Sequence, residues 1–263
     1  MSELTQEQIE FFDREGYLAI ESLTTPEDVA FLRESYDRIF AQQAGRGDGN
    51  QFDLAGTDEE GKAASLPQIL GPAKYAPEMN DSLLLKNARA LVKQLFGKDA
   101  TCEIAHAILK PARVGSPTPW HQDAAYWGPN YDYNATISIW VPLQDTPIEM
   151  GCMQFVPGSH RTQEIWPHQH INNDPRIHGL ELRPEELWRG ENAVACPLKA
   201  GGATIHGGYA LHYTSANRSN TPRRALILGG GLPATKRTTP RHLPWQAEEQ
   251  STHTAKKKQL QKA

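Results

Sequence analysis

Residues 120–127 read Trp-His-Gln-Asp-Ala-Ala-Tyr-Trp, and the pair His121 and Asp123 is the most informative feature of this stretch. Side chains two residues apart on a strand point to the same face of a sheet. An imidazole and a carboxylate on one face are two of the three protein ligands in a 2-His-1-carboxylate site, which holds non-haem Fe(II). Because His-x-Asp triplets often arise by chance, this interpretation needs a second histidine on a later strand.

The sequence around this pair predicts a mainly β protein with an N-terminal helical part. Helical patterns and one short strand occupy most of residues 1–97, including a capping Thr25 followed by Pro26. We therefore expect an α+β, mainly β fold in which a β-sandwich or barrel packs against helices. The strand-like segments are 101–110, 135–143, 152–156, 194–198, 203–206, 209–215 and 223–229.

The chain shows no interdomain linker, so we expect a single domain at residues 1–247. Its helical layer would cover residues 1–97 and its β core residues 98–235. Residues 248–263 are polar and basic, which predicts a flexible tail. The long polar segment 160–193 has no clear strand pattern and is expected to be a binding loop.

Composition and charge favour a small-molecule partner. The net charge of -4 argues against a nucleic-acid-binding surface over the whole molecule. The cysteines Cys102, Cys152 and Cys196 are widely separated, which indicates reduced thiols and a cytoplasmic protein. We find neither a signal peptide nor an apolar run of the ~20 residues that a membrane-spanning helix needs. Oligomeric state is not readable from the sequence.

A second histidine, His212, lies in an apolar region that ends near residue 228. The turn-prone stretch 216–222 separates two apolar strands and predicts a hairpin. In a regular hairpin His212 would lie opposite Arg223, with Cβ atoms ~5 Å apart. An arginine at this position can bind a carboxylate through two parallel hydrogen bonds. His206 is an alternative ligand in the same region, but Arg223 is better placed beside His212.

Taken in order, these motifs resemble the phytanoyl-CoA dioxygenase family of Fe(II)/2-oxoglutarate oxygenases. The resemblance spans about residues 101–229, with Glu149-Met150-Gly151 replacing the common Asn-Gly turn. It implies a double-stranded β-helix (a jelly-roll, cupin-like core) with the N-terminal helices packed on one sheet. The matching motifs are His121-Gln-Asp123, Ile139-Trp140-Val-Pro, Pro157-Gly-Ser-His160, His212-Tyr-Thr214-Ser-Ala-Asn217 and Arg223.

The resemblance also implies roles for individual residues. His121, Asp123 and His212 would form the catalytic centre and bind Fe(II). Arg223 would bind the distal carboxylate of 2-oxoglutarate, and O2 would be the other co-substrate. Two further pairs match family positions: Trp140 and Thr214 for the co-substrate, and Tyr126 and Trp127 for the substrate.

Simpler structural interpretations exist for several of these residues. Trp140 suits a buried core position, and Thr214 suits a strand end that bonds to backbone. His160 fits a structural turn. His168 and His170 have the spacing of a metal-binding pair, although a solvated loop explains them better. Two residues before the site, His106 and Lys110, either contact the co-substrate or line the sheet.

The implied reaction is hydroxylation of a small organic metabolite, with 2-oxoglutarate converted to succinate and CO2. Asp123 argues against halogenation, because halogenating relatives have Ala or Gly at that position. Desaturation, epimerisation or cyclisation at the same centre are the alternatives within this chemistry. A non-catalytic jelly-roll binding protein is the alternative outside it. The sequence does not identify the substrate.

Overall fold

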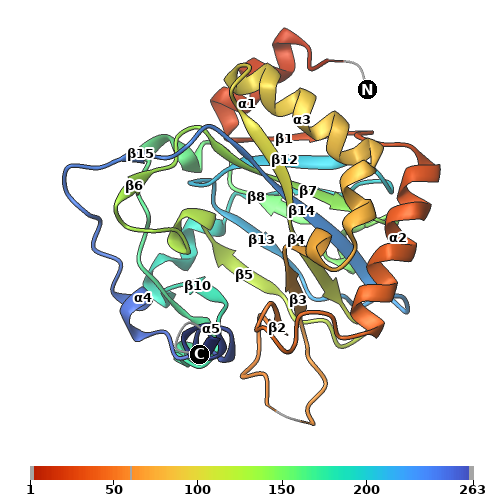
Figure 1. Ribbon diagram of the computed structural model, residues 1–263. Coiled ribbons are helices and arrows are strands. Elements are labelled where there is room, and N and C mark those ends of the chain that lie inside the picture. The colour runs from red at the N-terminus through yellow and green to blue at the C-terminus, as the bar shows by residue number, and fades with distance from the viewer. Residues whose placement is uncertain (1–2, 60, 261–263) are drawn as a thin grey trace.

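The computed structural model describes residues 3–59 and 61–260 and contains two antiparallel sheets that enclose a core (Figure 1). The larger sheet has, in spatial order, β1 (Tyr17–Ile20), β12 (Ala203–Gly207), β7 (Thr136–Pro142), β14 (Arg223–Gly231), β4 (Thr101–Lys110), β3 (Pro67–Leu70) and β2 (Gln51–Asp53). The smaller sheet has β11 (Val194–Cys196), β8 (Met153–Phe155), β13 (His212–Thr214) and β5 (Thr118–His121). This is the predicted jelly roll with added helices.

Two strand pairs and five helices complete the regular structure. The pairs are β9 (His168–His170) with β10 (Leu180–Leu182), and β6 (Tyr131–Asp132) with β15 (Thr235–Lys236). The α-helices are α1 (Gln6–Glu15), α2 (Pro26–Ala41), α3 (Leu83–Phe96), α4 (Pro244–Glu248) and α5 (Thr252–Leu260). Short 3-10 turns lie at Pro72–Lys74, Pro77–Asp81, Asp123–Ala125, Ile148–Met150, Ser159–Thr162, Ile171–Asn173 and Pro184–Gly190. Among the described residues, none of the helices combines the length and the apolar composition that a membrane span requires.

Side-chain caps begin the three N-terminal helices, and the predicted cap Thr25 is one of them. Thr5 and Gln8 form a reciprocal capping box at the start of α1, and Gly16 ends that helix at a φ of 80°. The side chains of Thr25 and Ser82 accept backbone N–H groups at the starts of α2 and α3. These caps fix where each helix starts relative to the sheet beside it.

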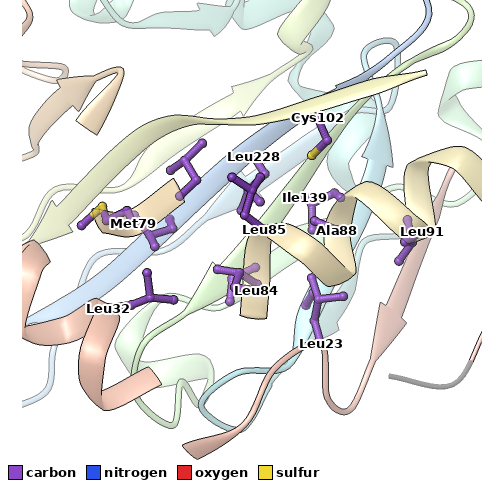
Figure 2. Packing of buried hydrophobic residues seen from close by; sticks show 14 of the residues in the cluster. Leu23, Leu32, Met79, Leu84, Leu85, Ala88, Leu91, Cys102, Ile139 and Leu228 are labelled. Atoms are coloured by element: carbon purple, nitrogen blue, oxygen red, sulfur yellow. The ribbon is translucent and has the colours of Figure 1, made fainter. Parts of the chain in front are cut away.

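Helices α2 and α3 cover the outer face of the larger sheet. Figure 2 shows Leu84, Leu85 and Ala88 of α3 packed toward Ile139 and Leu228 of the sheet. All five of these side chains are buried. Burying such a side chain contributes roughly 1.5–3 kcal/mol, so this layer anchors the sheet against the helices.

Alternation along β7 gives the larger sheet two different faces. Ile137, Ile139 and Val141 belong to the cluster under the helices. Ser138 and Trp140 point the other way and line an internal cavity. Both faces of β7 are buried, but only the inner face carries polar side chains. Alternate residues of this strand therefore pack under the helices or line the cavity.

Three sequence expectations about segments differ from the structure. Residues 1–97 are not purely a helical layer, because β1, β2 and β3 join the larger sheet. The segment 160–193 contains β9 and β10. The expected flexible tail, residues 248–263, contains α5 up to residue 260, with Lys257 bonded to Asn50, while residues 261–263 lie outside the described residues.

The predicted hairpin between His212 and Arg223 is wrong. Strand β13 pairs with β5 and β8 in the smaller sheet, whereas β14 pairs with β4 and β7 in the larger one. The turn-prone stretch crosses from one sheet to the other, and Arg223 lies opposite Lys110 instead. Local patterns predict turns and strands but do not say which sheet a strand joins.

Candidate metal centre and cavity

Two strand ends bring the predicted ligands together. His121 is the last residue of β5 and Asp123 begins the following 3-10 turn, with the intervening Gln122 extended (φ -116°, ψ 132°). The extended Gln122 keeps the His121 and Asp123 side chains on one side, although only His121 is in the strand. His212 is the cross-strand partner of His121. One ligand atom from each of these residues lies within 4.8 Å of the others.

Hydrogen bonds orient the two histidines for metal binding. Nδ1 of His121 lies 2.7 Å from the carbonyl oxygen of Pro119, and Nδ1 of His212 lies 2.9 Å from that of Ala210. A carbonyl only accepts, so both Nδ1 atoms carry the proton and both Nε2 lone pairs are free. These Nε2 atoms lie 3.7 and 3.5 Å from Oδ1 of Asp123.

The second oxygen of Asp123 is held by the protein. Ser138 donates its hydroxyl to Oδ2 at 2.5 Å, and Nε2 of His206 lies 3.3 Å from the same atom. His206 is thus beside the carboxylate, and its ring centroid lies 4.3 Å from that of His212. The ligand group of three is His121, Asp123 and His212, which supports His212 over His206 as the distal ligand.

Electrostatics favour the protonation states that bind a cation. Burial lowers the pKa of His121 to about 3, with a further contribution from His212, so His121 is neutral near pH 7. Burial alone would raise the pKa of Asp123, but His212 and His206 outweigh it and hold that pKa well below its usual range. A neutral imidazole beside an ionised carboxylate is the state that coordinates a divalent metal.

The triad opens into a cavity of about 930 Å³ between the sheets. Strand residues of both sheets form part of its wall, including Ser138 and Met153. Connecting segments contribute other lining residues, which are Leu54, Tyr126, Trp127, Tyr133, His178 and residues 232–234. The volume is that of a typical small-molecule site.

Arg223 is a buried charged residue that lines the same cavity. Its side chain is 1% exposed, and its guanidinium carbon lies 5.3 Å from the centre of the Trp140 ring. Nε and Nη1 have no hydrogen-bond partner among the described residues, and burial lowers the pKa to about 10. A buried guanidinium with free donors is costly unless a ligand pairs with it.

The predicted co-substrate and substrate residues also reach the cavity. Trp140 and Thr214 line it near Arg223. Tyr126 lies edge-on to the His121 ring with centroids 5.9 Å apart, and its hydroxyl accepts the N–H of Leu180 at 2.7 Å. Trp127 packs against Gly208, where any side chain would collide with the indole ring.

Of the remaining histidines and Lys110, some line the cavity and others bond to the backbone elsewhere. His106 lines the cavity, whereas Lys110 is fully buried and donates to the carbonyl oxygens of Ser116 and Ser215. His160 lies in a turn and bonds to the carbonyl of Asp13. His168 and His170 are both buried and bond to backbone groups, so the interpretation of these two histidines as part of a solvated loop is wrong.

Sequence reasoning missed three residues that shape the site. Gln122 bonds to Glu164 and Tyr209 and so fixes the peptide between the first two ligands. Ser138 holds the carboxylate, and His178 lines the cavity. The alternation of Ser138 with apolar neighbours was a usable signal, whereas His178 carries no local motif.

The fold and the site define a class of protein, the jelly-roll oxygenases with a 2-His-1-carboxylate centre. The profile of the phytanoyl-CoA dioxygenase (PhyH) family matches residues 12–225, and the chain belongs to this family. It is therefore an Fe(II)/2-oxoglutarate-dependent dioxygenase, an oxidoreductase.

Relatives and solved structures agree with this placement. The crystal structure of EvdO2 from Micromonospora carbonacea var. aurantiaca with 2-oxoglutarate is 33% identical and covers 93% of this chain and 97% of its own, with a TM-score of 0.77. A probable alpha-ketoglutarate-dependent hypophosphite dioxygenase of Stutzerimonas stutzeri is 25% identical, covering 85% of this chain and 77% of the relative. The carbocyclase SnoK from nogalamycin biosynthesis shares the fold at 24% identity, 89% and 87% coverage and a TM-score of 0.70.

Proposed function

We propose that the protein hydroxylates a small organic metabolite, with Fe(II) held by His121, Asp123 and His212. One O2 oxygen enters the substrate C–H bond, and the other enters succinate as 2-oxoglutarate loses CO2. We propose that Arg223 binds the distal carboxylate of 2-oxoglutarate. The observation that carries the proposal is a buried arginine with free donors in the same cavity as the triad.

The residues of the chain have distinct tasks in this reaction. Bound Fe(II) supplies the redox centre at which O2 and 2-oxoglutarate react. The carbonyls of Pro119 and Ala210 keep the histidine Nε2 atoms directed at the metal. Arg223 and the Trp140 ring position a carboxylate, and the buried side chains of the cavity wall limit the water at the reacting carbon.

Turnover of 2-oxoglutarate tests the proposal. Protein with Fe(II), ascorbate and O2 is expected to form succinate, slowly even without substrate. His121→Ala and Asp123→Ala should abolish Fe(II) binding and succinate formation, while His160→Ala, outside the cavity, should retain both. Full iron affinity and turnover in the two ligand variants would refute the assignment.

The reaction outcome is proposed as hydroxylation, and product mass tests it. A gain of one oxygen supports hydroxylation, whereas loss of two hydrogens indicates desaturation or ring closure and an unchanged mass indicates epimerisation. The fold alone does not choose, since jelly-roll neighbours include a carbocyclase and an epimerase. A non-catalytic binding protein would show no charge-transfer band when 2-oxoglutarate is added to the Fe(II) protein without O2.

We also propose that the enzyme works in the cytoplasm on a free small molecule. The free, buried thiols of Cys102, Cys152 and Cys196 support a reducing compartment. Fractionation of the source cells, followed by immunodetection, tests the location. Recovery in a membrane or extracellular fraction would contradict it.

A further inference from the structure

A second polar arrangement lies on the cavity wall, away from the metal ligands. His178 lines the cavity from the connection between β9 and β10. Its Nδ1 lies 2.8 Å from Oε1 of Glu249, which lies between α4 and α5. Both side chains are about one-fifth exposed (19% and 22%), so the pair sits at the boundary of the cavity.

Glu249 fixes the tautomer of His178. Burial alone would raise the pKa of Glu249, but hydrogen bonds from His178, Thr254 and Ser251 outweigh it and lower the pKa to about 2. The ionised carboxylate only accepts, so Nδ1 of His178 carries the proton. In the neutral ring, Nε2 is then an acceptor, and it has no hydrogen-bond partner among the described residues.

Neighbouring rings hold this imidazole in place. Its centroid lies 4.9 Å from that of Phe52, 5.1 Å from that of His253 and 5.9 Å from that of Tyr126. The Tyr126 ring in turn lies 5.9 Å from His121. The Tyr126 ring therefore lies between His178 and the metal ligand His121. This separation suits a substrate group that lies several bonds from the reacting carbon.

We propose that Nε2 of His178 accepts a hydrogen bond from a substrate hydroxyl and that Glu249 is the positioning residue for this contact. The proposal rests on the proposed function and assigns the substrate a class, a hydroxyl-bearing organic molecule. Gln68 and His106 support this class, because both line the cavity and neither side chain has a hydrogen-bond partner among the described residues. The aromatic rings of Tyr126, Trp127 and Tyr133 provide the apolar wall.

Nitrogen-15 NMR of histidine-labelled protein, loaded with Zn(II) and 2-oxoglutarate, tests the proposal without turnover. His178→Gln identifies the His178 resonances by their loss. The wild type should show an unprotonated Nε2 at His178, retained in Glu249→Gln, whose amide oxygen still accepts, and lost in Glu249→Ala. A protonated Nε2 in the neutral wild-type ring would overturn the proposal.

Two matched probes test the contact itself. Cyclohexanol carries a hydroxyl, whereas methoxycyclohexane has nearly the same shape and no donor. Titration with cyclohexanol should shift the Nε2 resonance of His178, and methoxycyclohexane should not. The exposed His242 offers a control, because His242→Leu should leave the response unchanged. No response to cyclohexanol, or equal responses to both probes, overturns the proposal.

The same variants separate this proposal from the proposed function. The charge-transfer band and substrate-free succinate formation report the metal and 2-oxoglutarate alone, and the exposed control His242→Leu should leave both unchanged. Absence of both signals in the wild type would refute the proposed function while the NMR response could still be measured. Loss of both signals in His178→Gln alone would instead place His178 at the metal and refute the proposed contact.

Discussion

Arg223 shows how one side chain links stability to ligand binding. Its charge is buried beside Lys110, and no described carboxylate neutralises it. Desolvation of an unpaired charge costs free energy in the ligand-free protein, and a bound carboxylate offsets this cost. The arginine should therefore contribute little to the stability of the ligand-free fold and much to the affinity for a dicarboxylate.

Substitution of Arg223 by Gln tests this reasoning. Removing one partner of a buried charged pair costs about 2–5 kcal/mol, so affinity for 2-oxoglutarate should fall on the order of a hundredfold or more. The ligand-free variant should be no less stable than the wild type. Calorimetric titration and thermal unfolding measure the two effects, and retained affinity would contradict the role of Arg223.

Ser138→Ala tests how Asp123 is oriented. The Ser138 hydroxyl holds Oδ2, so its loss should let the carboxylate rotate and should weaken Fe(II) binding by about 10–100-fold. Co(II) absorption spectra should change as well, since they report ligand geometry. Thr136→Ala on the same strand is the matched control, and equal effects in the two variants would argue against a specific role for Ser138.

At the scale of elements, the sequence predicts the bounds of strands whose apolar and polar residues follow a clear pattern. The segment 101–110 is β4 with the predicted bounds, and 223–229 begins β14 at the predicted residue. The pairing of β13 with β5 was not predictable from local pattern, because register depends on long-range packing. Short strands such as β5, with Pro119 inside it, carry too little pattern to be recognised.

The candidate site residues divide in the same way into those that local sequence patterns predict and those that only the folded chain reveals. His121, Asp123 and His212 sit in ordered motifs and were predictable, as was their approach in space. His178 and Glu249 lie in connections, and only the folded chain brings them together. No periodicity encodes a contact between segments more than seventy residues apart (|i−j| = 71).

Lys110 ties three elements together and gives a stability prediction. Its ammonium group donates to the carbonyl oxygens of Ser116, Thr214 and Ser215. Lys110→Met would leave buried acceptors without partners, at about 1–3 kcal/mol each, so we expect a loss of roughly 2 kcal/mol or more. Urea unfolding measures this loss in the free energy of unfolding. As a control, Lys93→Met at an exposed position should change that free energy by no more than about 0.5 kcal/mol.

At the scale of the whole molecule, ionisation of Glu249 makes the packing of the C-terminal helices depend on pH. Its folded pKa of about 2 lies below the ordinary value of 4.5, so its stabilising contribution is present above about pH 4.5 and is lost as the pH falls toward 2. Hydrogen exchange of residues 248–260 should accelerate in this window beyond the intrinsic change. Glu249→Gln should remove that extra pH dependence, and an unchanged profile would contradict it.

The cavity wall combines two kinds of structure, and this has a consequence for how the enzyme changes over time. The pairing of His212 with His121 and the strands of the larger sheet depend on register, where a shift by one residue would misplace a side chain. Other lining residues lie in connections, at 126–128, 133, 178 and 232–234, which can vary in length and sequence without moving a strand of the two sheets. New substrates can therefore be acquired by exchanging these connections, while the oxidising centre is inherited intact.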